Sequence, residues 1–388
     1  MRRTIKALFL TLLLLFIATT AFGAQITPQF LANVANGGCD WTVLNIARSE
    51  ARDNYDAYIN AQRENVSARY SANGEFSSSV TDTQRTVLAL GAAGANVRDF
   101  GEYNGEAIDL LADATYNMNR DSVDCQGLTS AVYGLLALDC VSTLVPSDAK
   151  FTREDFINSI ISYRLTDGGF TYWGESYDPD MTGMVLQALA PYKEQDNVKE
   201  IIDKAVELLA QNQLGNGDCS SWGTSNPEST AQVLIALCAL GIDYRTDERF
   251  IKNSNTLLDG IEKYRLPDGT FSHEAGGDSN SFATYQANAG LIAAARFDAG
   301  KTSFYNYADT AVWRTTASFE NNVATVYSDT ATAAYFISAE MEDDIVKTVK
   351  VQSVELQNGK NEFAAECIGY AMLLDKQMRP LVRRIEEI

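Results

Sequence analysis

Histidine is almost absent from this chain, which has one, His273, among 388 residues. A Ser-His-Asp hydrolase would depend on that side chain alone. No G-x-S-x-G motif accompanies it, so we do not expect this chemistry. Long apolar runs are also lacking: beyond residue 23 no stretch approaches the roughly 18 consecutive apolar residues of a membrane-spanning helix. We therefore predict no membrane span in the mature chain.

Basic residues are scarce, with 31 Lys and Arg against 51 Asp and Glu. Three of them, Arg2, Arg3 and Lys6, precede an apolar stretch at 7–18 that leads into small residues. This pattern predicts a signal peptide at 1–23 and a secreted or cell-surface protein. The mature chain would keep 28 basic and 51 acidic residues, a formal charge of −23. Such a charge argues against nucleic-acid and anionic-membrane partners.

An internal repeat of the form T-x5-[AG]-L runs through most of the chain. Its starts, two of them looser versions, are Trp41, Thr83, Ala131, Thr182, Thr230 and Thr284. The spacing of about 50 residues is typical of helical-hairpin repeats. Four residues before each start stands a residue favoured at a helix N-cap. These residues are Gly37, Ser79, Gly127, Asp178, Asn226 and Asn280.

Two kinds of helix are predicted to alternate. Segments such as 184–190 and 233–240 are apolar on nearly all faces, which is typical of a buried helix. Others, such as 198–209, carry apolar residues on one face and charges between them. Six of each kind predict a mainly α fold, an α6/α6 toroid at 24–315. In this ring the N-termini of the inner helices would converge on one mouth.

Glycine and aromatic residues gather just before the buried helices, at 167–174, 216–223 and 267–273. Glycine permits tight turns, and the aromatic rings would either plug the mouth or contact a ligand. The candidate ligand-binding residues are Trp41, Tyr172, Trp173, Tyr177, Trp222, Phe271 and Tyr285. A small-molecule or glycan ligand would suit such a mouth.

The repeats resemble those of the prenyltransferase and squalene-cyclase superfamily, the terpenoid-cyclase-like α/α toroids. The stretches that carry the resemblance lie at 39–49, 178–192, 226–243 and 282–286. They are most similar to exported proteins of Gram-positive bacteria, some of which join the ring to a β domain. Cobalamin carriers share this layout, so the resemblance suggests a corrinoid as one ligand. The superfamily also includes isoprenoid cyclases, protein prenyltransferases and thioester domains.

The acid chemistry of the superfamily has only a partial counterpart here. Its cyclases use a D-x-D-D motif, and the chain offers Asp178-Pro179-Asp180-Met181, which lacks the last acid. Asp178 is equally explained as a helix cap, with Asp180 in the first turn. Asp180 with either Glu228 or Asp218 would also supply the carboxylate pair of a glycosidase. Asp178, Asp180 and Glu228 therefore stay candidate catalytic residues beside this structural explanation.

The superfamily also suggests a zinc site. Its prenyltransferases bind zinc through Asp-x-Cys and a later His, whereas Asp218 and Cys219 are adjacent here and precede His273. These residues are candidate zinc ligands, or else a turn Asp, a loop Cys and a solvated His. Cys39 lacks a Gln three residues later, so no thioester is expected. The sequence leaves the pairing of its six cysteines open.

The pattern changes after residue 315, where β-prone segments follow one another. Strands are predicted at 334–339, 345–356, 363–367 and 370–374, with a hairpin turn at Asn358-Gly359. We expect a small β-sandwich-like domain at 316–388. It would bind a cell-surface partner or cover a ligand.

These observations predict an exported, non-catalytic protein that binds a small or extended ligand at the mouth of the toroid, and the resemblance suggests that this ligand is corrinoid-like. The alternative is an enzyme on the same fold, either isoprenoid cyclase/prenyltransferase-like or glycan-processing. The first hypothesis requires no cofactor. Zinc would accompany a prenyltransferase-like site, and cobalamin would be the ligand of a carrier-like protein.

Overall fold

The structure is a computed structural model. It describes residues 40–49, 55–140, 145–309, 315–320, 322–328, 331–342, 345–357, 359–367, 370–376, 381 and 385–386. These residues form two compact units. The first contains the described residues of 40–65 and 160–304, and the second those of 66–159 and from 305 onward. The predicted signal peptide, the cap at Gly37, and Cys39 lie outside the described residues.

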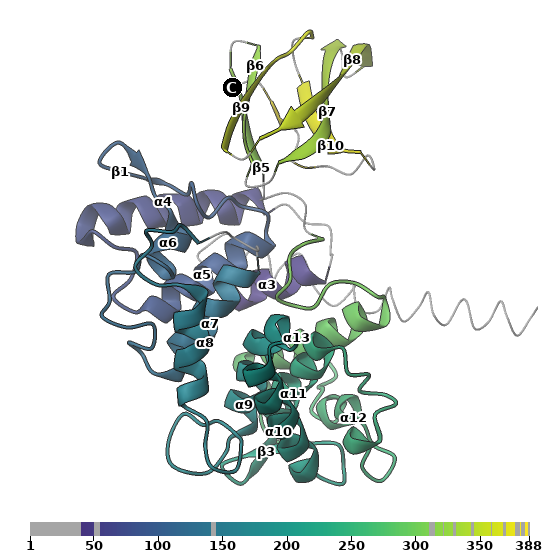
Figure 1. The fold of residues 1–388 in the computed structure, drawn as a ribbon. Coiled ribbons are helices and arrows are strands. Elements are labelled where there is room, and N and C mark those ends of the chain that lie inside the picture. The colour runs from purple at the N-terminus through teal and green to yellow at the C-terminus, as the bar shows by residue number, and fades with distance from the viewer. Residues whose placement is uncertain are drawn as a thin grey trace, which may run out of the picture. The chain divides into compact units, whose positions relative to one another are not determined.

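The first unit is built around a layer of buried helices. Its elements are α3 (Asp40–Arg48), the start of α4 (Asp56–Asn73), the end of α8 (Arg153–Ser162), α9 (Pro179–Leu189), α10 (Asp196–Asn212), the hairpin of β3 (Cys219–Ser221) and β4 (Thr224–Asn226), α11 (Pro227–Leu240), α12 (Leu257–Glu262) and α13 (Ser281–Asp298), with single turns η1 (Ala190–Tyr192) and η2 (Glu248–Phe250). Helix α11 packs against α9, α12 and α13, and α13 packs against α3 (Figure 1).

The two kinds of helix differ in burial as the sequence predicts. Helix α11 buries residues on all its faces, whereas α10 buries one face, from Val198 to Ala210, and exposes the charges between. Glycine allows two of the buried helices to pack closely. A Cβ at Gly183 would lie 2.8 Å from the backbone of Gln232, and one at Gly290 would lie 2.9 Å from the Cβ of Ala231.

The second unit has a helical part and a β part. The helical part contains the rest of α4 and most of α8, with α5 (Val80–Ala92), α6 (Leu110–Ala114), α7 (Leu128–Asp139) and a small hairpin of β1 (Glu102–Tyr103) and β2 (Glu106–Ala107). Helix α5 packs against both α6 and α7. In the two units together, five predicted N-caps are confirmed. They are Ser79, Gly127, Asp178, Asn226 and Asn280.

The β part consists of two antiparallel sheets that share one core. One sheet has the order β11-β10-β7-β8 and the other β5-β6-β9. The strands are β5 (Thr315–Glu320), β6 (Val323–Ser328), β7 (Thr332–Glu342), β8 (Ile345–Leu356), β9 (Gly359–Ala364), β10 (Tyr370–Asp375) and β11 (Ile385–Glu386). Phe336 of the first sheet meets Phe363 of the second, with ring centroids 5.8 Å apart. The core around this pair includes Val326 and Leu373.

The hairpin predicted at Asn358-Gly359 is wrong. Strand β8 pairs with β7, and β9 pairs with β6, so the chain crosses from one sheet to the other between them. An Asn-Gly pair favours a tight turn, but it does not choose the strand with which the next segment pairs. Here β9 pairs with β6 and so completes the second sheet.

The mainly α class with a small sheet-containing C-terminal region is therefore confirmed. Among the residues that the structure describes, no helix is both long and apolar enough to cross a membrane. Closure of the six hairpins into a ring stays a prediction.

Candidate functional site

The threonine that begins the repeat motif has a structural role. The hydroxyls of Thr182, Thr230 and Thr284 each accept a hydrogen bond, at 3.0 Å, from a backbone N–H in the loop before their helix. The donors are Phe170, Cys219 and Phe271. Each threonine therefore fastens one loop to the first turn of a buried helix. We call these three loops, residues 163–178, 213–226 and 263–280, the mouth loops.

Removing one of these hydroxyls should loosen its mouth loop. We expect Thr230→Val to lower the free energy of unfolding by about 2 kcal/mol, because the buried N–H of Cys219 loses its acceptor. Urea-induced unfolding followed by circular dichroism measures the change. Thr230→Ser keeps the hydroxyl and should lose less than half as much, and an equal loss in both variants would contradict the role of the hydrogen bond.

The residues fastened in this way point into the core. Phe170 and Phe271 are fully buried, and Cys219 is 3% exposed. Burial raises the pKa of the Cys219 thiol, which disfavours the thiolate that a metal requires. Phe271, a predicted ligand-binding residue, thus packs the end of the helix layer instead of facing solvent.

Other aromatic side chains of the mouth loops face outward. Trp173 is 74% exposed, Trp222 72% and Tyr172 46%. Trp222 occupies the turn between β3 and β4 with a left-handed φ of 52°. The remaining predicted ligand-binding residues, Trp41, Tyr177 and Tyr285, are half-buried.

Two polar links bring the mouth loops together. Ser221, beside Trp222, donates its hydroxyl to Asp178 at the start of α9. His273 Nδ1 lies 2.9 Å from Glu228 Oε1 in the first turn of α11. These contacts join the loops before α9, α11 and α13 at the N-terminal ends of those helices.

Asp178 and Asp180 have different environments although one residue separates them. Asp178 caps α9, because its Oδ1 accepts the Met181 N–H at 3.0 Å and its Oδ2 accepts the Ser221 hydroxyl. Its structural explanation is confirmed. Asp180 instead keeps a buried Oδ1 with no hydrogen-bond partner among the described residues.

Asp180 also has a pKa far above the usual value of an aspartate. Burial, followed by the charge of Asp178 and then that of Glu228, raises its pKa to about 7. Ser229 and His273 oppose this rise. Glu228 is 91% buried at its side chain and also leaves one oxygen, Oε2, without a hydrogen-bond partner in the described part of the chain. The pair thus offers a proton donor near neutral pH beside a buried carboxylate.

The predicted zinc ligands are not brought together. Asp218 Oδ2 accepts hydrogen bonds from the Lys263 ammonium and from the Tyr264 hydroxyl, the latter at 3.0 Å, and so ties its loop to the end of α12. His273 contacts Glu228 instead. Across the described ranges, no group of three or more His, Cys, Asp or Glu side chains is placed to hold a metal ion. Cys125, Cys219, Cys238 and Cys367 carry free thiols.

Sequence reasoning did not identify the Glu228–His273 pair or the burial of Asp180. One signal was present in the repeat itself, since Asp180 and Glu228 hold the same position, two residues after the N-cap. The sequence matches no family model and no curated protein.

Proposed function

We propose that this is an exported, non-catalytic protein that binds a small or extended ligand on its mouth loops, at the open end of a closed α/α toroid. The observation that carries the proposal is the exposure of Trp173 and Trp222, at 74% and 72% of their surface. The two rings stand on loops that the Ser221–Asp178 hydrogen bond links, and exposed large aromatic groups at such a place favour a binding surface. The rings offer flat apolar faces, while the nearby carboxylates supply hydrogen-bond acceptors.

The rigidity of the loops supports this proposal. Each mouth loop is held by its threonine and by the links of Ser221 and His273 to neighbouring helices. A preorganised surface loses little conformational entropy when a ligand binds. Flat ligands that suit it include sugar rings and, by the resemblance, a corrinoid.

An enzyme on the same fold is the second candidate, and one observation favours it. Asp180, with a pKa near 7, stands in the first turn of α9, and Glu228 with His273 lies close enough to influence that pKa. A carboxyl that keeps its proton up to about pH 7, close to a second buried carboxyl group, is the arrangement of a general acid and base. A glycan-processing activity fits these groups better than alkene protonation, because only part of the D-x-D-D motif is present.

The test begins with protein secreted by its native cells and mass spectrometry of the ligand that co-purifies. We expect Trp173→Ala with Trp222→Ala to weaken binding of that ligand about 30-fold or more, since exposed aromatic anchors contribute about 2 kcal/mol or more to binding. The control pair, Trp173→Phe with Trp222→Phe, keeps a flat ring at each position and should retain most of the affinity.

Two results would change the conclusion. Equal affinity of the Ala pair and the native protein would show that the ligand binds elsewhere. Conversion of the ligand to a product by native protein, with loss of that conversion in Glu228→Gln, would establish the enzyme.

A further inference from the structure

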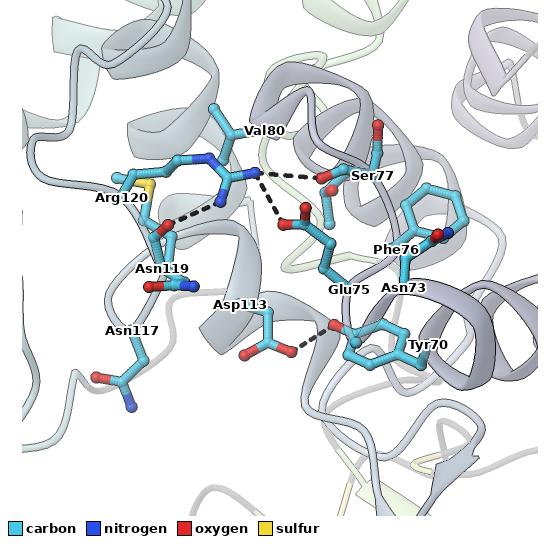
Figure 2. A pocket seen from close by; sticks show the side chains of 13 residues that line it. Tyr70, Asn73, Glu75, Phe76, Ser77, Val80, Asp113, Asn117, Asn119 and Arg120 are labelled. Atoms are coloured by element: carbon cyan, nitrogen blue, oxygen red, sulfur yellow. Dashed lines mark hydrogen bonds and ion pairs between the residues drawn. The ribbon is translucent and has the colours of Figure 1, made fainter.

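A separate cavity of about 220 Å³ lies in the helical part of the second unit. Figure 2 shows its lining, which comes from the end of α4, the turn before α5, helix α6 and the segment after it. All of these residues lie between positions 70 and 120. The cavity shares no residue with the mouth loops of the first unit.

One wall of the cavity is fixed by an ion pair, which also neutralises the charge of Arg120. Arg120 Nη2 lies 2.8 Å from Glu75 Oε2 and 2.9 Å from the carbonyl oxygen of Ser78. The guanidinium is thus held in place by groups of the turn before α5. Because its charge is already paired, Arg120 is a poor receptor for an anionic ligand.

The opposite wall presents a carboxylate with a fixed orientation. Asp113 of α6 accepts a short hydrogen bond from the Tyr70 hydroxyl (Figure 2). Partial burial raises the pKa of Asp113, and the hydrogen bond from Tyr70 opposes this effect. Because Tyr70 occupies Oδ2 of Asp113, Oδ1 stays available as a hydrogen-bond acceptor.

Three amides complete the polar lining. The side chains of Asn73 and Asn119 have no hydrogen-bond partner among the described residues, and Asn117 uses only Oδ1, which accepts the Lys150 N–H at 3.2 Å. Each amide both donates and accepts hydrogen bonds. Val80 and Met118, which are nearly fully buried, add an apolar contribution to the lining.

We propose that this cavity binds one neutral sugar ring, either free or at the end of a glycan. Sugar hydroxyls donate and accept at the same oxygen, and they match a lining of amides with one oriented carboxylate. The volume is below the roughly 300–1,000 Å³ of pockets for drug-sized ligands, so it suits a single ring. The acidic chain, with a net charge of −20, also disfavours anions.

Saturation-transfer NMR of the full chain with methyl glycosides of glucose, galactose, mannose and N-acetylglucosamine tests this inference. We expect at least one glycoside to bind. Asp113→Asn should weaken that binding about tenfold, which corresponds to 1.4 kcal/mol, and Asn119→Ala should weaken it as well. Asp121→Asn, the same change on the exposed neighbour of Arg120, should leave the affinity within about twofold.

Binding of none of the four glycosides overturns the proposal, and so does equal affinity of native protein and Asp113→Asn. Preferential binding of an amine such as methylammonium would overturn it too, since a lone carboxylate would then be the receptor. The Trp173→Ala and Trp222→Ala pair should bind the glycoside normally. Failure of the mouth-loop proposal and failure of this one are therefore distinguishable.

Discussion

Leu237→Ala is expected to lower the free energy of unfolding by about 3 kcal/mol, because it leaves a cavity in the centre of the helix layer. Leu237 is fully buried on α11, which packs against both α9 and α13. It is also the last residue of the repeat motif. The equivalent residues Leu90, Leu138 and Leu189 are fully buried as well.

Urea-induced unfolding followed by circular dichroism measures this loss. The two units can unfold in separate transitions. The urea midpoint to compare is therefore that of the transition that the Leu237→Ala mutation shifts. Leu214→Ala provides a matched control, because Leu214 is 38% exposed in a mouth loop. It should lose less than about 1 kcal/mol. A similar loss in both variants would show that α11 is not the centre of the packing.

Features that depend on local chemistry could be predicted from the sequence. An N-cap is set by one side chain and the next three residues, and Asp178, Asn226 and Asn280 each accept a backbone N–H from that first turn. The buried face of α10 follows from helical periodicity alone. Strands β8 and β10 were also located from the sequence, because each is a continuous run of β-prone residues.

Features that depend on distant partners could not be predicted. The aromatic residues of the mouth loops form one class in the sequence, yet Phe271 is buried and Trp222 is exposed. Phe271 turns inward in a loop that is tied, through its N–H, to Thr284 thirteen residues later. The Glu228–His273 contact spans 45 residues, and sequence spacing contains no information about it.

The mouth loops combine features that stabilise the fold with features that oppose it. The threonines, the Asp178 cap and the Asp218–Lys263 pair hold the loops in place. Asp180 does not contribute in this way, because a buried carboxylate without full hydrogen bonding destabilises the protein when it is charged. Natural proteins depart from local stability rules mainly at functional sites. This makes Asp180 the residue of the mouth loops at which the enzyme alternative is best tested.

Asp180→Asn should stabilise the protein at alkaline pH and have little effect at acidic pH. The folded-state pKa of about 7 is above the unfolded value near 3.8, so the folded protein holds this proton more tightly. The stability from the protonated carboxyl is full below about pH 4 and is lost as the pH rises through 7. Asparagine stays neutral throughout. We expect the variant to exceed the native protein by about 4 kcal/mol at pH 8.5, and by only about 1 kcal/mol at pH 4.5.

Urea-induced unfolding of both proteins at pH values between 4 and 9 measures this difference. Asp196→Asn is the matched control, since Asp196 stands in the first turn of α10 and is exposed. Its effect should be slightly destabilising and nearly independent of pH across this range, because an exposed acid at a helix N-terminus is favourable. A difference for Asp180→Asn that does not grow with pH would mean that Asp180 is ionised in the folded protein at acidic pH. The enzyme alternative would then lose its proton donor.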